Sequence, residues 1–514
     1  MKLKYILVFS VFSLVGFCVF FLSGTQANLP SKKSLNIAWA TEPHSYDPRY
    51  ATDANSQYLE GLLHCSLITF DADGNITKDL AKSWEWISGT QLNMQIKPGV
   101  SFADGSAVTL MDVKKTYDFF IYKNKFRPSP RAVAFRNLKE LKIKNKTLQF
   151  FLKKPDASFL SNLVIGILPD SLNTKGLITK ETKVRGCGLF VHKKSTLNEI
   201  ILERRKQKNK NHEAKVSLVK IKIVKDPTTR FAKLRKGELD IVQNGVSYQN
   251  ISSIEQYQDL KVLKSPALRT SYLGFNFRHP LLRNVEVRKA IAHSINKKAI
   301  IQYILKGLAS EAKSLLPERH QYSSLAEEAY EYNIARANEI LDKAGLKSKG
   351  KEGVRFSLTL TLTNDPTRIA ASKVLVSDLK KIGIQLKVRI LEWGKFKQDV
   401  EKGLIDLWLL SWIGYKDPDI YRYAFATESF PPNGGNRGWY SNPDLDKLLN
   451  EGINVYDLNK RKEIYGKISS LVTADLPYIF LYHDNNYAVL RKNIKNFKIY
   501  ADGRYSSLNN VEKL

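Results

Sequence analysis

Residues 356–413 constrain the fold most, because strand-like and helix-like patterns alternate along them. Apolar and polar residues alternate over 384–390, and 356–362 and the run that begins at Ile405 are also apolar and of strand length. Between them, 369–382 and 395–402 are helix-like, and each is followed by a glycine that stops it. A strand, helix, strand, helix, strand order predicts an α/β domain whose parallel or mixed sheet carries helices on its faces.

The last of these strands leads into an unusual loop. Residues 405–419 read IDLWLLSWIGYKDPD, an apolar run followed by Gly414 and an Asp-Pro step that forces a turn. The loop carries Trp412, Tyr415, Lys416, Asp417 and Asp419. Ligand sites of α/β proteins lie where strands end in such loops, so we expect this one to meet a ligand. An ordinary strand and turn with surface aromatics is the alternative.

The N-terminus has the layout of an export signal. Lys2 and Lys4 precede an apolar run over 5–22, and small and polar residues follow up to Ala27. We therefore expect an exported, periplasmic or extracytoplasmic protein that is cleaved after Ala27. A run of 18 residues is also close to the shortest membrane-spanning helix, so residues 1–27 remain either a signal peptide or an N-terminal anchor.

The charge and the cysteines leave two questions open. The net charge of +31 suggests an anionic partner, but the basic residues are scattered, which favours a simple role in solubility. Export and the lack of any recognisable module argue against nucleic acid. Cys65 and Cys187 remain after cleavage. A disulfide between them is possible in an oxidising compartment, although two free, buried cysteines are favoured.

Several short motifs follow one another over about seventy residues. They are EPHSYDP at 42–48, the Asp73-Gly74 hairpin, LAKSW at 80–84, KPGVSFADG at 97–105 and a helix capped by Thr109 that begins near Asp112. In this order they resemble the family 5 extracellular solute-binding proteins, the dipeptide-, oligopeptide- and nickel-binding receptors of ABC importers. The similarity continues through YLGFNF at 272–277, where Tyr272 and Asn276 stand near the family's crossing between lobes, and YSNPDLDKLL at 440–449.

The resemblance implies an α/β, two-lobe periplasmic-binding-protein-like fold with an extra subdomain on the first lobe. Lobe I would comprise 28–55, 175–268 and 485–514, the extra subdomain 56–174, and lobe II 269–484. We expect a monomer that closes its lobes over a small-molecule or peptide ligand and meets ABC transporter permease subunits in the inner membrane.

The chain departs from the family at the ligand site. Peptide binders present an aspartate after the cleft tryptophan, as W-x-x-D-Y-x-D-P, to pair with the ligand's ammonium group. Here the loop is one residue shorter and Tyr415 replaces the acid, a spacing closer to the nickel-binding and other non-peptide branches. Lys416 and Arg437 would favour a carboxylate or phosphate. The candidate ligand-binding residues are Trp412, Tyr415, Lys416, Tyr272, Asn276, Arg437 and Asp417. Surface cations, hinge packing and, for Asp417, a structural turn are the alternatives.

The sequence therefore predicts the extracytoplasmic substrate-binding component of an ABC importer, with a short peptide or a similar small solute as ligand. A ligand-sensing receptor for a membrane partner is an alternative. A secreted hydrolase is much less favoured, because the chain lacks G-x-S-x-G and H-E-x-x-H motifs. The eight histidines show no metal-ligand spacing, so we expect no metal, no cofactor and no enzymatic activity.

Overall fold

The computed structural model describes residues 34–121, 129–173, 176–182, 185–206, 214–323, 330–348 and 353–514. The predicted export signal therefore lies outside the described residues. Within them, no helix has both the length and the apolar composition needed to cross a bilayer. One large mixed sheet runs through the molecule in the order β15-β14-β16-β12-β17-β11-β1-β10-β9-β8, and β13 pairs with β17 at its side.

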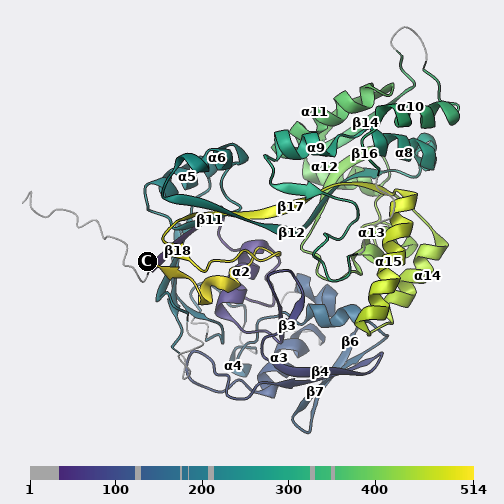
Figure 1. Cartoon of the computed structure of the whole chain (residues 1–514). Coiled ribbons are helices and arrows are strands. Elements are labelled where there is room, and N and C mark those ends of the chain that lie inside the picture. The colour runs from purple at the N-terminus through teal and green to yellow at the C-terminus, as the bar shows by residue number, and fades with distance from the viewer. Residues whose placement is uncertain are drawn as a thin grey trace, which may run out of the picture.

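Two long strands join the lobes, running side by side across the centre of the molecule (Figure 1). They are β12 (Leu260–Phe275) and β17 (Tyr478–Arg491). The patterns YLGFNF at 272–277 and LPYIFLY at 476–482 predict only short strands. That prediction was wrong about length, because each strand continues through the junction. β12 pairs with β16 of lobe II and with β17, and β17 pairs further along with β11 of lobe I.

Lobe I is built around the part of the large sheet that runs from β11 to β8. Its strands are β1 (Ser34–Trp39), β8 (Phe190–Ser195), β9 (Glu199–Arg204), β10 (Leu218–Ile223) and β11 (Ile241–Gln243). Its helices are α2 (Ala54–Leu63), α5 (Pro227–Arg235) and α6 (Tyr248–Ser252), with short 3-10 turns at Ile254–Gln256 and Ser506–Asn509. A small pair, β18 (Ile494–Lys495) and β19 (Glu512–Lys513), closes the chain. β1 is parallel to β10 and β11, so these three strands end at the same edge.

The extra subdomain has a separate four-stranded sheet and its own core. Its sheet is β4 (Ala81–Ser88), β5 (Gln91–Ile96), β7 (Thr147–Leu152) and β6 (Leu138–Lys144), preceded by the hairpin β2 (Ile68–Phe70) and β3 (Ile76–Lys78). Its helices are α3 (Leu110–Ile121), α4 (Asp170–Asn173) and the 3-10 turns Pro130–Phe135 and Ala157–Asn162. Thr109 and Asp112 exchange hydrogen bonds at the start of α3, as the capping-box pattern predicts.

A disulfide joins Cys65 to Cys187, so the favoured prediction of two free cysteines was wrong. The cause is a close backbone approach that sequence separation does not reveal. A Cβ added at Gly188 would lie 2.5 Å from the Leu63 carbonyl carbon, so glycine alone permits this contact. The contact brings the two cysteine Cα atoms to 5.1 Å.

Lobe II has the predicted alternation of strands and helices. Its parallel strands are β14 (Phe356–Thr363), β15 (Ile384–Leu391) and β16 (Leu407–Ile413), linked by α11 (Pro366–Lys380) and α12 (Trp393–Glu401). The remaining elements are α7 (Pro280–Arg283), α8 (Val285–Ser294), α9 (Lys297–Ala299), a π-helical turn (Ile300–Ile304), β13 (Ala309–Glu311), α10 (Ile334–Lys343), α13 (Ile420–Phe425), a 3-10 turn (Thr427–Ser429), α14 (Pro443–Ile453) and α15 (Leu458–Asp475).

Two apolar cores cover the two faces of the lobe II sheet, and β16 contributes alternate residues to them. Leu407 and Leu409 belong to the core under α8, α10 and α11, whereas Trp408 and Leu410 belong to the core under α12 to α15. This alternation is the ordinary period of a strand buried on both faces. The α/β class is thus observed, while the residue boundaries between lobes remain a prediction.

Candidate functional site

The carboxyl ends of the parallel strands of both lobes point toward the junction between the lobes. β16 is antiparallel to β12, which enters lobe II, so β16 runs back toward lobe I and ends at Ile413 opposite Arg269. β11 is antiparallel to β17 and therefore runs toward lobe II. In open α/β sheets, ligands bind outside the carboxyl ends of the strands. We therefore take the end of β16 and the adjoining part of β12 and β17 as the candidate site.

Tyr415 and Tyr272 lie on the buried face of this ladder. The Tyr415 hydroxyl donates to the Leu315 carbonyl over 3.0 Å and shares a hydrogen bond with Thr270. Tyr272 is fully buried and stacks on Tyr478 with ring centroids 4.0 Å apart. Both predicted site residues thus contact protein groups within lobe II, and their ligand roles remain predictions.

Trp412 connects this buried face to the surface. Its ring stacks beside Tyr272 with centroids 6.0 Å apart, and Tyr423 meets its edge. The guanidinium carbon of Arg437 lies 5.2 Å from the ring centroid, a cation–π distance. The structure therefore brings three predicted residues, Trp412, Tyr272 and Arg437, into one stack.

Lys416 bridges the two lobes. Its Nζ lies 3.1 Å from Oδ2 of Asp502 in the C-terminal segment of lobe I and 4.1 Å from the ring centroid of Phe70 in the extra subdomain. Burial, together with the nearby charge of Arg504, lowers the pKa of Lys416 to about 8, against the opposing effect of Asp502. The lysine is therefore paired within the protein.

Asp417 and Asn276 hold neighbouring segments together. Arg461 of α15 forms a forked pair with Asp417 over 2.8 and 2.9 Å, and both side chains are largely buried. The Asn276 amide donates to the Gly403 carbonyl over 2.9 Å and joins the end of β12 to the end of α12. Asp417 and Asn276 are thus paired within the protein, and their ligand roles remain predictions.

The opposite face of the same ladder carries a polar cluster that sequence reasoning missed. It consists of Arg269 and Ser271 on β12, Ser411 and Ile413 on β16, and Asp484 on β17. The two serine hydroxyls are 2.9 Å apart, Ser271 donates to Asp484 over 3.3 Å, and Arg269 Nε lies 3.6 Å from Asp484 Oδ2. Ile413 is 65% exposed and the Arg269 side chain is 44% exposed. We call these five residues the junction cluster.

The alternation of residues along 405–413 could have shown that Ser411 and Ile413 share a face that Trp412 does not. Arg269 and Asp484 gave no such signal, because they come from strands that are distant in the sequence. Burial raises the pKa of Asp484 although Arg269 and Ser271 favour its charged form.

The charges of the junction cluster also influence two tyrosines outside lobe II. Burial raises the pKa of Tyr58 on α2 to about 12, with a further rise from Asp502, and the charges of Arg504 and Arg269 oppose it. Burial and the charge of Asp484 raise the pKa of Tyr248 on α6, and Arg269 again opposes the rise. The charge of Arg269 therefore acts on both lobes.

Comparisons with known proteins establish the family. The family model described as "Bacterial extracellular solute-binding proteins, family 5 Middle" matches residues 75–432, well over half of the chain. The chain belongs to this family. The oligopeptide-binding protein AppA of Bacillus subtilis is 26% identical over 92% of this family 5 chain and 89% of its own length. The glutathione-binding protein GsiB of Pectobacterium atrosepticum is also 26% identical, over 92% and 93%.

Solved structures confirm the predicted two-lobe fold of this family 5 protein. HbpA2 of Haemophilus parasuis superposes with a TM-score of 0.83 at 22% identity, over 94% of this chain and 100% of its own. NikZ of Campylobacter jejuni, solved in complex with Ni(L-His), gives a TM-score of 0.76 at 25% identity over the same shares. The relatives AppA, GsiB and NikZ are described with oligopeptides, glutathione and Ni(L-His), so family membership establishes solute binding and leaves the ligand to the site.

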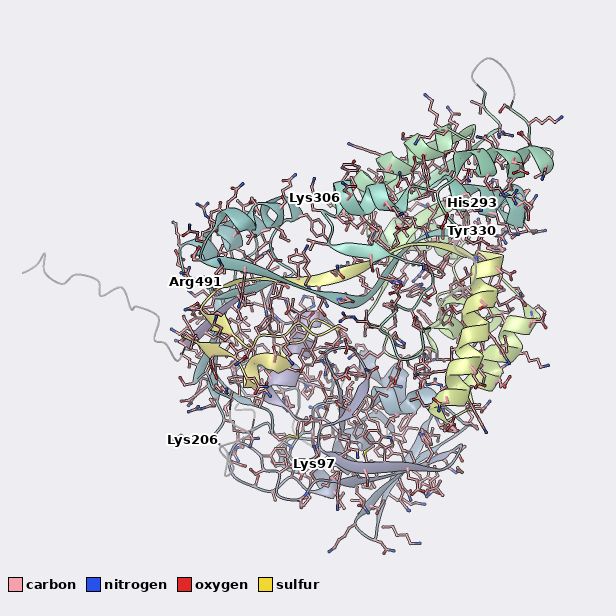
Figure 2. All side chains as sticks on the ribbon, viewed as in Figure 1. Lys97, Lys206, His293, Lys306, Tyr330 and Arg491 are labelled. Carbon is pink, nitrogen blue, oxygen red and sulfur yellow. A yellow bond between two sulfur atoms is a disulfide. The ribbon has the colours of Figure 1, made fainter. Side chains whose placement is uncertain are left out.

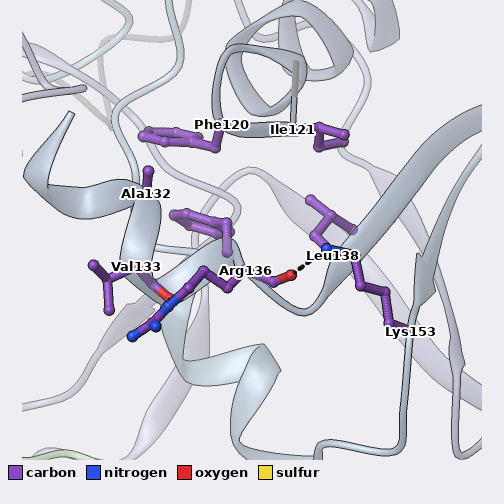
Figure 3. A pocket seen from close by; sticks show the side chains of 8 residues that line it. Phe120, Ile121, Ala132, Val133, Arg136, Leu138 and Lys153 are labelled. Atoms are coloured by element: carbon purple, nitrogen blue, oxygen red, sulfur yellow. Dashed lines mark hydrogen bonds between the residues drawn. The ribbon is translucent and has the colours of Figure 1, made fainter. Parts of the chain in front are cut away.

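Two further hollows in the family 5 protein lie away from the junction cluster. One, of about 580 Å³, lies in the extra subdomain between α3 and the Pro130–Phe135 turn (Figure 3). It is mostly apolar, and Lys153 at its rim donates to the Arg136 carbonyl over 2.7 Å. The other, of about 550 Å³, lies in lobe II beside Lys297, Glu311 and Phe480. Neither includes a predicted ligand residue.

The positive charge is spread over the molecule. The exposed side chains of Lys97, Lys206 and Lys306 lie on separate parts of it (Figure 2). Within the described ranges, no group of three or more His, Cys, Asp or Glu side chains is arranged to hold a metal ion. The junction cluster offers anchoring charges and hydroxyls, which is the chemistry of a binding site.

Proposed function

We propose that this protein is the extracytoplasmic substrate-binding component of an ABC importer and that it captures a short peptide or a similar small solute between its lobes. The observation that carries the proposal is the family match over residues 75–432. The half-exposed Arg269 and the exposed Ile413, placed where β16 ends at the lobe junction, support it. Permease subunits in the inner membrane are the proposed partner, and a monomer is the proposed form.

The mode of capture follows from the connection between the lobes. β12 and β17 pair on both sides of the junction, with irregular register between Pro266 and Thr270, and they can bend there while each lobe keeps its own core. A ligand that contacts both lobes stabilises the closed arrangement by its differential affinity for it. Export by residues 1–27, as a cleaved signal or as an anchor, belongs to the same proposal.

Native mass spectrometry of the gently purified protein tests the binding role, before and after partial unfolding that strips bound ligand. We expect a bound small molecule or a set of peptides. Adding ligand back at a hundredfold excess over its Kd should raise the free energy of unfolding by about 2.7 kcal/mol. A protein that carries no ligand and gains no stability from any peptide or solute would contradict the proposal.

A sensing role is the second candidate, because a change in the arrangement of the two lobes, which Lys416 and Asp502 join by an ion pair, can report a bound ligand to a membrane partner. The two roles differ in what the liganded protein does. The liganded importer component stimulates the ATPase activity of a reconstituted permease and ATPase encoded beside it. A sensor leaves that activity unchanged.

A further inference from the structure

The contact between Arg269 and Asp484 is longer than the buried Arg49–Asp47 pair of lobe I. Arg269 reaches Asp484 through a single Nε contact of 3.6 Å. By contrast, Arg49 contacts Asp47 through two nitrogens at 2.9 and 2.7 Å, and both side chains are buried. The Arg269 guanidinium makes no hydrogen bond to the protein among the residues that the structure describes. It therefore keeps its fork of N–H donors available.

The Asp484 carboxylate, on the same face of the sheet as Arg269, can accept further hydrogen bonds. Its carboxylate is largely buried, with an exposed side-chain fraction of 11%, and its hydrogen-bond donor is the Ser271 hydroxyl at 3.3 Å. Burying a carboxylate costs free energy unless donors compensate it. Among the described residues, one long hydroxyl contact, one long ion pair and the more distant charge of Arg368 compensate Asp484 only in part, since its pKa is still raised. A second cationic donor placed beside Asp484 would therefore be strongly favoured.

The position of the pair fits a ligand site better than a structural role. It lies where β16 ends, beside the exposed Ile413, in the part of β12 and β17 that crosses from one lobe to the other. The family's peptide binders are expected to carry an aspartate in the loop after the tryptophan, and this chain has Tyr415 there, buried in lobe II. Asp484 supplies a carboxylate to the same region from a different strand.

We propose that Arg269 and Asp484 together bind a ligand head group whose ammonium and carboxylate sit on one carbon, as in a free α-amino acid or a γ-linked peptide. This inference rests on the proposed function. The two anchoring side chains are adjacent, so the complementary charges of the ligand must be adjacent too. The ligand carboxylate pairs with the Arg269 fork and its ammonium with Asp484 and Ser271. An ordinary α-peptide separates its two terminal charges and engages one anchor alone.

A pair of isomeric ligands tests this geometry on the stripped wild-type protein. γ-Glutamylglycine carries the ammonium and a carboxylate on one carbon, whereas α-glutamylglycine has the same composition and separates them. Calorimetric titration should show the γ isomer or one of the twenty free L-amino acids binding at least roughly tenfold more tightly than the α isomer, as expected for charged hydrogen bonds. Acetylating the ammonium or amidating the carboxylate of the bound ligand should cause a similar loss.

Three variants test whether Arg269 and Asp484 determine the ligand affinity. Arg269→Gln and Asp484→Asn should each weaken binding of the preferred ligand about tenfold or more. Arg319→Gln is the matched control, since Arg319 also makes one 3.6 Å contact with an aspartate, Asp73, and is exposed. It should change affinity less than twofold. If a variant does not fold, as judged by thermal denaturation, Arg269→Lys and the acetylated and amidated ligands decide.

The outcomes separate this inference from the proposed function. If α-peptides bind and neither the γ isomer nor any free amino acid does, the inference is wrong while the binding role stands. Unchanged affinity in both Arg269→Gln and Asp484→Asn also overturns it. If no ligand co-purifies and neither peptides nor amino acids bind, both proposals fall.

Discussion

The two faces of the ladder between β12 and β16 differ in what their polar groups contact. On the first face, Thr270 and Tyr415 are buried and share hydrogen bonds with each other and with the Leu315 carbonyl. On the second face, Arg269 is half-exposed and makes one long contact with Asp484, beside the exposed Ile413. Residues next to each other in the sequence thus have different tasks, since a strand places its neighbours on opposite faces.

The difference shows that a sequence motif can locate a ligand site without identifying the residues that contact the ligand. The loop after Trp412 is where the ligand site is expected, and the junction cluster lies at that strand end. The loop residues Tyr415, Lys416 and Asp417 nevertheless contact protein groups, because buried polar side chains must be satisfied inside the fold. If the two faces have these separate tasks, changes on the first should alter stability and changes on the second should alter ligand affinity.

The largest loss of stability is expected at the Asp417–Arg461 pair, in the loop that follows β16. Asp417→Ala leaves the buried guanidinium of Arg461 without its forked partner, so the free energy of unfolding should fall by about 3–5 kcal/mol. Urea denaturation followed by tryptophan fluorescence measures the change. Arg336→Ala, which breaks an exposed pair with Glu339, is the control and should cost less than about 1 kcal/mol. An equal loss in both variants would remove the distinction between buried and exposed pairs.

Asp419, two residues further along the same loop, should make stability depend on pH. Burial raises its pKa from 3.8 to about 7, with Arg422 opposing and Asp417 adding to the rise. The folded protein therefore holds a proton on Asp419 that the unfolded chain has lost, so this contribution to stability is complete below about pH 4 and is lost as the pH rises through about 7. It should be about 2–3 kcal/mol smaller at pH 8 than at pH 5.

Asp419→Asn isolates this contribution. The amide keeps an acceptor for the Tyr465 hydroxyl, which donates to Asp419 over 3.0 Å, and it does not titrate. The stability of the variant relative to the wild type should rise between pH 5 and pH 8 by the same amount. A pH-independent difference between the two proteins would show that Asp419 stays charged in the folded state.

Much of this architecture follows from local sequence patterns. The alternation over 384–390 and the glycines after α11 and α12 placed these lobe II elements, and Thr109 caps α3 as the sequence predicted. Such signals depend on neighbours within a few residues. The length of β12 and the Cys65–Cys187 bond depend on segments far apart in the chain, and so does the pairing of Arg269 with Asp484. Composition and spacing do not report those distances.

A smaller loss is expected for Tyr415→Phe. The change removes one buried hydroxyl and its bonds to Thr270 and the Leu315 carbonyl, while the ring keeps its packing, so stability should fall by about 1–2 kcal/mol. In the variant the Thr270 hydroxyl, released from Tyr415, can donate to the Leu315 carbonyl 2.8 Å away, which limits the cost. Ligand affinity, measured by calorimetry, should stay within twofold of the wild type. A tenfold weaker affinity at unchanged stability would show that Tyr415 contacts the ligand, and the two faces would then not have separate roles.

The smallest change in stability is expected at Ile413, on the second face. Since its side chain is 65% exposed, Ile413→Ser should alter the free energy of unfolding by no more than about 0.5 kcal/mol. A ligand held by Arg269 would cover this side chain, so the same variant should lose about 1 kcal/mol of binding free energy, roughly fivefold in affinity. Leu404→Ser is the matched control, because Leu404 is 63% exposed in the turn before β16. Equal affinities in the two variants would show that Ile413 does not contact the ligand, and would contradict the assignment of ligand binding to the second face.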